Sequence, residues 1–340
     1  MIFFDTPVRV FFCLAGATLL SAGLVRAMIG LAVLDHPDHR SAHNHPTPKG
    51  GGIGIMLAFA TVWPLLLLFA PQPMPRTSLL AVIALGILCG VSWLDDLRQW
   101  PAGIKLAAQC GAAVLVVAGA GTANTLPGMG LAVLWLIFCT NAINFMDGLN
   151  GLVSGCLLVG CLLLAGAAPS LGVPELRWPA ALLAACLAGF LPFNFPQARI
   201  FMGDVGSQGC GLLAGMATLY GAQHATTPSG WLFGPAVLAP LLYDVTFTLI
   251  RRSLAHQRLM QAHRGHLYQV LYRSGLTVRT VSMAEWGLTA WGGGIACATA
   301  TLPGPEALPL ATLLVLVLVP QLGWTALAIV RAQKNPIGPW

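Results

Sequence analysis

Carboxylate side chains occur in this chain where apolar stretches end. Asp95 and Asp96 are adjacent, and Asp147 and Asp204 follow two later apolar stretches. Two adjacent carboxylates that cannot both ionise cheaply are suited to proton transfer or to holding a divalent cation, although a solvated helix end also tolerates such a pair. Ionisable groups close to hydrocarbon are costly, which makes them functional candidates. If these carboxylates lie on the same side of a membrane, they form one site.

The stretch 141–151 (NAINFMDGLNG) combines amides, a carboxylate and glycines. Asn141, Asn144 and Asp147 are three residues apart, which places them along one side of a helix. Asn150 then follows between the two glycines that end this helix. Amides alone can join membrane helices through hydrogen bonds, but so many polar groups in a short stretch exceed that need. We therefore expect this stripe to face a cleft or the interior of a helix bundle and to belong to a functional site.

Glycines surround Asp204 in the stretch 201–207 (FMGDVGS). Glycine permits close backbone approach, and the first N–H groups of a helix can bind phosphate. Asp204 is a candidate ligand for Mg²⁺, which takes one or two protein oxygens and completes its shell with water and substrate phosphate. An aspartate at a helix start is more often only a cap, so this stretch is informative chiefly in combination with the others.

Basic side chains complete the set of candidates. Lys49 lies in the stretch 46–52 (PTPKGGG), which predicts a rigid turn followed by a flexible glycine hinge. Lys105 opens the apolar stretch that follows the adjacent aspartates, and the stretch 263–266 (HRGH) offers several donors for a pyrophosphate group. The alternative for these residues is that they are merely the basic residues of cytoplasmic loops. Asp244 is expected to be a structural or loop-orienting charge rather than a catalyst.

The composition indicates a membrane protein. The chain has 340 residues, of which 56% are hydrophobic and 8% are charged, with a mean hydropathy of +0.77. The hydrophobic fraction lies above that of soluble domains and the charged fraction lies far below it. The nine cysteines lie in apolar stretches and form no Cys-x-x-Cys pair, so we expect packing residues rather than disulfides or a zinc site.

The hydropathy pattern predicts an all-α, polytopic membrane protein in a single domain covering residues 1–340. We expect about eleven membrane-spanning helices, near residues 8–34, 53–70, 77–94, 104–120, 129–146, 149–168, 179–195, 206–222, 232–250, 283–301 and 308–330. Lysine and arginine concentrate in alternate loops, which predicts a periplasmic N-terminus and a cytoplasmic C-terminus. The predicted cytoplasmic segments are 35–52, 95–103, 196–205 and 251–282. All the candidate side chains then fall at the cytoplasmic face, in one active-site cleft.

The net charge of +6 does not indicate a nucleic-acid partner, because the basic residues lie in the segments between helices. That distribution suits membrane lipids with anionic head groups, or phosphorylated substrates.

In this order, the polar motifs resemble those of the polyprenyl-phosphate N-acetylhexosamine-1-phosphate transferase family. The matching stretches are 46–52, Asp95-Asp96 with Lys105, 141–151, 201–207 and 263–266. The resemblance covers about residues 35 to 280, and the ordered set is far more specific than any one motif. These integral membrane enzymes transfer a sugar 1-phosphate from a UDP-sugar to undecaprenyl phosphate and release UMP. Transfer of this kind depends on positioning and charge neutralisation more than on covalent catalysis.

The resemblance implies a role for each candidate. Asn144 and Asp204 look like the ligands of Mg²⁺, with Mn²⁺ as the alternative metal. Asp95 and Asp96 look like the acidic pair that positions or deprotonates the lipid phosphate, so that the expected catalytic residues are this pair and Asp204. The remaining candidates are expected to bind the substrates: Lys49, Lys105, Asn141, Asp147, Asn150, His263, Arg264 and His266.

Two departures favour one branch of the family. The peptidoglycan-initiating branch has three successive histidines in the last motif, where this chain has only His266 followed by leucine, and it usually has aspartate in place of Asn150. We therefore expect the branch that starts O-antigen, lipopolysaccharide or other envelope polysaccharides with UDP-GlcNAc or a related UDP-N-acetyl-6-deoxyhexose. The alternatives are a phospho-MurNAc-pentapeptide transferase and, in a different class, an ion-coupled transporter, whose site would lie near the bilayer midplane. A multi-pass protein of the bacterial inner membrane is expected, with a homodimer as one alternative for its assembly.

Overall fold

The computed structural model describes residues 6–35, 45–69, 78–98, 100–120, 125–224, 228–259, 261, 263–300, 309–335, 337–338 and 340. Its helices are α1 (Thr6–Leu31), α2 (Gly51–Phe69), α3 (Ser78–Arg98), α4 (Ala102–Ala120), α5 (Leu126–Met146), α6 (Leu152–Ala167), η1 (Pro174–Leu176), α7 (Arg177–Asn194), α8 (Gly203–His224), α9 (Pro228–Val237), α10 (Ala239–Leu254), α11 (Leu267–Arg273), α12 (Val278–Ala300) and α13 (Leu310–Lys334). Residues 36–44, part of the expected cytoplasmic segment 35–52, lie outside the described residues.

The expected all-α architecture with several membrane-spanning helices is confirmed. Seven of the described helices are long and apolar enough to cross a membrane, and the bent pair formed by α9 and α10 raises the number to eight if it counts as one span. Each of the eleven expected segments overlaps a helix or this bent pair. The 16-residue α6 is shorter than a typical span, and α8 and α12 carry many glycine and polar residues. The number of spans and their orientation stay predictions.

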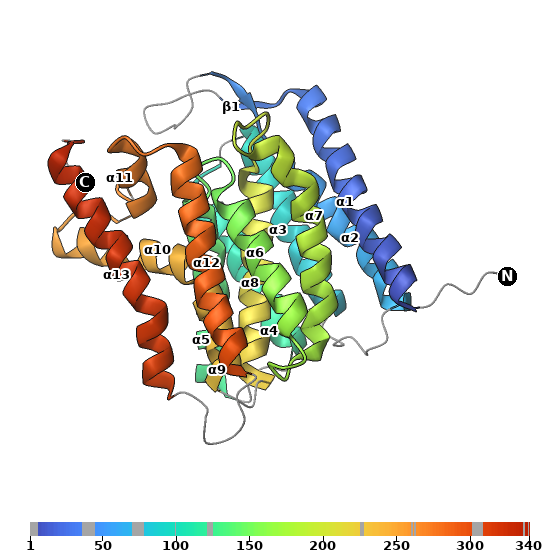
Figure 1. The fold of residues 1–340 in the computed structure, drawn as a ribbon. Helices are drawn as coiled ribbons and strands as arrows, with labels where there is room; N and C mark the ends of the chain where they lie inside the picture. The colour runs from blue at the N-terminus through green and yellow to red at the C-terminus, as the bar shows by residue number, and fades with distance from the viewer. Residues whose placement is uncertain are drawn as a thin grey trace.

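The long helices run side by side as a bundle (Figure 1). α1, α2 and α7 pack together at one side, α13 lies at the other, and α8 contacts α2, α3, α5 and α9. α10 makes an angle of 67° with α9 and therefore crosses the direction of the bundle. The start of α1 and the end of α13 lie at opposite ends of the bundle (Figure 1).

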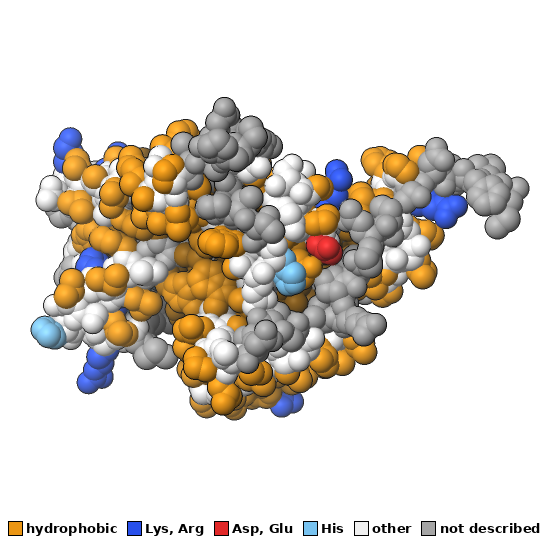
Figure 2. Space-filling view, turned by 90° about the horizontal axis from the view of Figure 1, so that it is seen from below, with side chains coloured by type: hydrophobic (Ala, Val, Ile, Leu, Met, Phe, Trp, Pro, Cys, Tyr) orange, Lys and Arg blue, Asp and Glu red, His pale blue; other side chains and the backbone are white. Residues whose placement is uncertain are grey.

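A short hairpin marks one end of the bundle. β1 (Leu34–Asp35) and β2 (Thr47–Pro48) pair antiparallel, with Leu34 opposite Pro48, and the hairpin lies at the upper end in Figure 1. The opposite end is mainly hydrophobic, with few charged side chains (Figure 2).

The glycines after Lys49 are not the flexible hinge that the sequence predicts. Gly51 and Gly52 are buried in the first turn of α2, and the Gly52 N–H donates to the Met202 carbonyl over 2.8 Å. A Cβ atom on Gly52 would lie 2.2 Å from the Gly206 backbone. Only glycine therefore allows the start of α2 to meet the start of α8, which brings Lys49 close to the residues around Asp204.

Candidate active site at one end of the bundle

Two lysines connect the candidate carboxylates of two helices, α3 and α8. Lys105, in α4, places its Nζ 2.9 Å from Asp204 Oδ2 of α8 and also pairs with Asp95 Oδ2 of α3. Lys49 places its Nζ 3.2 Å from Asp96 Oδ1. The adjacent aspartates thus pair with different lysines, and the structure brings together five of the predicted site residues.

Asp95 and Asp96 have different surroundings. Asp95 is only 4% exposed, and its Oδ1 accepts a hydrogen bond from the Trp100 N–H over 2.7 Å, which fixes the turn between α3 and α4. Asp96 Oδ2 is buried without a hydrogen-bond partner. A Cβ atom on Gly203 would lie 3.2 Å from this oxygen. The free oxygen of Asp96 therefore faces the first turn of α8, where Asp204 lies.

Asn144 connects α5 to the same turn of α8. Its Nδ2 donates to Asp204 Oδ1 over 3.1 Å and to Ser207 Oγ over 2.8 Å. The amide therefore presents nitrogen to Asp204, and it would have to turn over to present its oxygen to a metal. The two amide orientations differ only in their hydrogen bonds, so the turn is a local change.

Asn141 lies one helical turn deeper and binds other amides. Its Nδ2 donates to Gln109 Oε1 over 2.7 Å, and Gln109 Nε2 donates to Gln208 Oε1 over 3.2 Å. Gln208 Nε2 in turn lies 3.4 Å from Asp204 Oδ2. This chain of amides holds α4, α5 and α8 together behind Asp204. The substrate-binding role expected of Asn141 stays a prediction.

Asp147 follows the last residue of α5. Burial raises the pKa of its carboxyl well above the usual value, and the negative charges of Asp204 and Asp96 raise it further. Three carboxyl groups from three parts of the chain therefore share one electrostatic environment.

The turn after Asp147 is fixed by an asparagine that the sequence analysis missed. Asn194 Oδ1 accepts the Gly151 N–H over 2.7 Å, and its Nδ2 donates to the Ile200 carbonyl over 3.0 Å. Asn150 Nδ2 donates to the Pro196 carbonyl over 3.3 Å. A lone amide at the end of the apolar stretch 179–195 was the available signal for Asn194.

Asp244 orients the segment that contains His266, as the sequence analysis expected. Its Oδ1 lies 3.0 Å from His266 Nδ1 and accepts the Leu267 N–H over 2.9 Å, while its Oδ2 accepts the Tyr268 N–H over 3.0 Å. Asp244 is 1% exposed and His266 is 6% exposed. The carboxylate thus fixes the start of α11 and directs the Nε2 atom of His266 away from α10.

His263 is a neutral donor rather than a cation. Its Nδ1 accepts the Gly265 N–H over 3.1 Å, and its ring stacks on that of His266 with centroids 4.9 Å apart. Burial lowers the pKa of His263 to about 4, and electrostatic interaction with the neighbouring His266, Arg252 and Arg251 side chains lowers it further. Arg264 therefore supplies the permanent positive charge of the stretch 263–266.

Two arginines that the sequence analysis did not assign to the site hold the backbone of this segment. Arg251 Nη2 donates to the Gly265 carbonyl over 3.1 Å, and its guanidinium lies over the Trp340 ring, 4.6 Å from the centroid. Arg273 Nη1 donates to the Arg264 carbonyl over 2.9 Å. Gly265 and Arg264 lie 14 and 9 residues from these arginines and Trp340 lies much further along the chain, so no helical periodicity indicates the contacts.

The histidine segment and the carboxylates meet at the end of α5. Tyr268 donates its hydroxyl to the Phe145 carbonyl over 3.1 Å. A Cβ atom on Gly148 would lie 2.2 Å from the same hydroxyl oxygen. Tyr268 therefore packs the start of α11 against the end of α5, next to Asp147.

The charges of this site suit a divalent cation. Asp95, Asp96 and Asp204 pair with two lysines, which leaves one negative charge, and the nearby Asp147 carboxyl, whose pKa is raised, adds a second when it ionises. The buried, unpartnered oxygen of Asp96 adds an acceptor that no side-chain donor satisfies. Within the described residues, no three His, Cys, Asp or Glu side chains gather as a metal site, but Mg²⁺ needs only one or two protein oxygens besides substrate phosphate. The donor set therefore fits Mg²⁺.

Comparison with known proteins places these observations in a family. Residues 78–222 match the family model described as Glycosyl transferase family 4. A decaprenyl-phosphate N-acetylglucosaminephosphotransferase of Mycobacterium tuberculosis is 30% identical over 322 residues, covering 81% of this chain and 78% of the relative. A probable undecaprenyl-phosphate N-acetylglucosaminyl 1-phosphate transferase of Bacillus subtilis is 29% identical over 268 residues, covering 75% and 74%.

Relatives of the other branch are equally similar. A phospho-N-acetylmuramoyl-pentapeptide-transferase of a Synechococcus species is 31% identical over 301 residues, covering 80% of this chain and 85% of the relative. Overall identity therefore does not separate the two branches, and the choice of sugar rests on the site.

Proposed function

Because this chain belongs to glycosyl transferase family 4, we propose that it transfers a sugar 1-phosphate from a UDP-sugar to a polyprenyl phosphate. A phosphate oxygen of the acceptor forms a bond to the sugar-linked phosphorus of the donor. The bond from that phosphorus to the oxygen shared with the second phosphate breaks, and UMP leaves with that oxygen. The products are polyprenyl diphosphate-sugar and UMP.

The observation that carries this proposal is the joint pairing of Lys105 with Asp95 and Asp204 and of Lys49 with Asp96. It places cations and carboxylates from separate helices at one end of an apolar bundle. A lipid phosphate and a water-soluble nucleotide can meet only at such a boundary between hydrocarbon and water. A transporter needs its site near the midplane and reachable from both sides, which this arrangement does not favour.

The acceptor phosphate is assigned to Asp96 and Lys49. Asp96 has the oxygen without a partner, so it accepts the proton of an acceptor phosphate that arrives singly ionised. Lys49 lies beside it and neutralises the phosphate charge. Asp95 keeps Lys105 in place and is a positioning residue, because its two oxygens already bind Lys105 and the Trp100 N–H.

The UDP-sugar is assigned to the side of the site formed by residues 263–266 and the turn after α5. Arg264 supplies a permanent charge for the diphosphate, while His263 and His266 supply ring N–H donors. Asp147 and Asn150 line the turn that follows α5, beside these residues, and bind the nucleotide-sugar. Lys105 lies between the two halves and contacts the transferred phosphoryl group.

Asp204, and Asn144 once its amide has turned, would hold a Mg²⁺ ion, and Mn²⁺ has the same preference for oxygen. Such an ion would supply charge neutralisation and orientation for the transferred phosphoryl group. Lys105 and Asn144 hold the Asp204 carboxylate in its place.

UDP-GlcNAc or a related UDP-N-acetyl-6-deoxyhexose is the proposed donor, and undecaprenyl phosphate is the proposed acceptor. The two departures in the sequence, at His266 and Asn150, support this choice over a muramoyl-pentapeptide donor. The reaction is then the first membrane step of O-antigen, lipopolysaccharide or another envelope polysaccharide, at the cytoplasmic face of the bacterial inner membrane.

The test is to offer the purified protein a panel of UDP-sugars with undecaprenyl phosphate and Mg²⁺, and to follow UMP and the lipid product together. The expected result is UMP release in equal amount to lipid-linked N-acetylhexosamine, abolished by a chelator and restored by Mg²⁺. Turnover of UDP-MurNAc-pentapeptide alone would assign the other branch. UMP formation with no lipid product would contradict the proposed reaction.

A further inference from the structure

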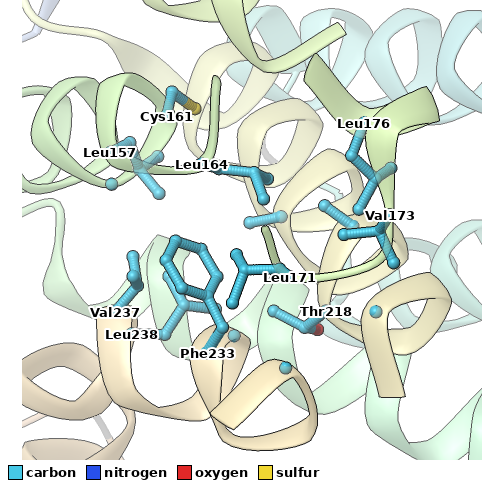
Figure 3. Close-up of a pocket in the computed structure, with 16 residues that line it drawn as sticks. Leu157, Cys161, Leu164, Leu171, Val173, Leu176, Thr218, Phe233, Val237 and Leu238 are labelled. Carbon is cyan, nitrogen blue, oxygen red and sulfur yellow. The ribbon is translucent and has the colours of Figure 1, made fainter. Parts of the chain in front are cut away.

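An apolar cavity lies inside the bundle, apart from the carboxylate cluster. α6, α8, α9 and the loop around residues 171–176 line a partly open cavity of about 60 Å³. Its side chains, among them Leu157, Leu164 and Phe233, point into a common space (Figure 3). At the end of the bundle opposite the hairpin, the surface is hollowed among hydrophobic side chains (Figure 2).

The walls of the cavity are helices in direct contact. A Cβ atom on Gly160 of α6 would lie 2.4 Å from Val237 of α9, and one on Gly234 of α9 would lie 2.4 Å from Thr218 of α8. The helices touch at these glycines and cannot close further. The contacts at these glycines therefore hold the helices at a fixed distance, and the cavity between them is not a sign of loose packing.

The lining offers nothing for a polar ligand. Thr218 is the lining residue that carries a hydroxyl, and this group already donates to the Gly215 carbonyl over 2.9 Å and accepts the Trp135 indole N–H over 2.8 Å. A water molecule needs two to four polar partners. A hydrocarbon group is the ligand that such a lining suits.

The position of the cavity relates it to the carboxylates. α8 begins beside Asp204 and lines the cavity with Ala214, Ala217 and Gly221. At 1.5 Å per residue, the cavity lies roughly 15 to 25 Å from Asp204 along the helix. That distance falls within the ~30 Å thickness of the hydrocarbon region.

We propose that this cavity binds the far end of the prenyl chain of the acceptor lipid, which rests on the proposed function. A deca- or undecaprenyl chain is longer than the hydrocarbon region is thick, so its far end must bend or be taken up by protein. Because its phosphate is held at the carboxylates, the chain end is present near the cavity at a high effective concentration. A free phospholipid acyl chain lacks this tether.

The first test fills the cavity and compares acceptors of different length. Ala217→Leu places three extra carbons in the cavity, and Ala326→Leu makes the same change on the exposed surface of α13. With undecaprenyl phosphate, kcat/KM is expected to fall about tenfold in Ala217→Leu and to stay unchanged in Ala326→Leu. With farnesyl phosphate, whose chain is too short to reach the cavity, both variants should match the unsubstituted protein. An equal loss for both acceptors, or no loss for either, would overturn the proposal.

A second measurement does not depend on a substituted protein. A prenyl phosphate with a diazirine at its far end, reconstituted with the unsubstituted protein and irradiated, is expected to label peptides of α6, α8 or α9, and excess undecaprenyl phosphate should prevent the labelling. Labelling of these peptides only by a diazirine-bearing phospholipid would assign the cavity to membrane lipid and overturn the proposal. Absence of turnover with any prenyl phosphate would contradict the proposed function, and the labelling would still decide what the cavity binds.

Discussion

Neighbouring residues in the chain can serve different purposes when their helix places them on different sides. Asp95 points to the turn between α3 and α4 and to Lys105, with both oxygens paired. Asp96 points to the start of α8 and keeps one oxygen unpaired. An unpaired acceptor in a buried place costs free energy of folding, and such a cost is typical of a site that binds a ligand.

This difference predicts that two identical substitutions have different effects. Asp95→Asn removes the charge that pairs with Lys105 at a buried position, so the free energy of unfolding should fall by about 3 kcal/mol. Asp96→Asn also removes the pair with Lys49, so it should lower thermal stability by a smaller amount, and it should lower kcat at least a hundredfold. Thermal unfolding in detergent and steady-state kinetics of the two variants measure both effects. Equal losses of stability would show that Asp96 is a structural residue like its neighbour.

The His263 ring gives a prediction about pH. Its pKa is lowered from 6.5 to about 4, so the unfolded chain binds a proton more readily than the folded protein between these values. Stability from this residue is therefore present above pH 6.5 and is lost as the pH falls toward 4. Thermal unfolding at pH 7.5 and pH 5 should show a smaller acid-induced loss in His263→Gln than in the unsubstituted protein. An identical loss in both proteins would contradict a buried, neutral His263.

At the scale of the elements, the site depends on where helices start and end. The carboxylates lie at the end of α3, after the end of α5 and at the start of α8, and the lysines lie just before α2 and near the start of α4. The sequence predicted these positions because apolar stretches and polar motifs alternate along the chain. It could not predict that Gly52 and Gly206 touch, since that contact joins residues far apart in the chain.

The contact between α2 and α8 predicts a strong effect of a single methyl group. Gly52→Ala places a Cβ atom 2.2 Å from the Gly206 backbone, so the start of α8 must move and Asp204 must move with it. Activity should fall more than tenfold, since small displacements of catalytic groups lower rates strongly. Gly86→Ala in α3 is the control, because a Cβ atom there meets nothing within 4 Å. Equal activity of the two variants would show that the contact does not position Asp204.

Other elements of the site were beyond sequence analysis for a physical reason. Arg251 and Asn194 bind backbone groups in other segments of the chain, and Trp340 acts through its contact with the Arg251 guanidinium. A side chain that binds a carbonyl group leaves no periodic pattern in the sequence. The cavity also depends on which small residues of three helices come together, and each of them alone is an ordinary residue of a membrane helix.

For the whole molecule, the order of apolar and polar stretches was sufficient to predict that the site forms at one end. Two motifs lie on the same side of the membrane when an even number of membrane-spanning helices separates them. The order of the helices along the chain therefore predicts which motifs come together. The structure places the start of α1 and the end of α13 at opposite ends (Figure 1). Which end faces the cytoplasm follows from the lysine and arginine distribution and stays a prediction.

Labelling of cysteines from outside intact cells tests this orientation. Arg258 is exposed in the segment after α10, and Arg258→Cys in a cysteine-free background should react with a membrane-impermeant maleimide only after the membrane is opened. A cysteine at Thr6, the first residue of α1, should react in intact cells. The reverse pattern would place the carboxylates and histidines on the side of the membrane that lacks UDP-sugars.

The central claim is that the carboxylate cluster transfers a sugar 1-phosphate rather than a sugar. The position of a radioactive phosphorus atom tests it directly: UDP-GlcNAc labelled in the sugar-linked phosphate is incubated with the protein, undecaprenyl phosphate and Mg²⁺. The account predicts that the label enters the lipid together with the sugar, that unlabelled UMP is released, and that Asp204→Asn abolishes both products at ordinary Mg²⁺ concentrations. Labelled UDP as the product, with an unlabelled lipid-linked sugar, would show transfer of the sugar alone and contradict the account.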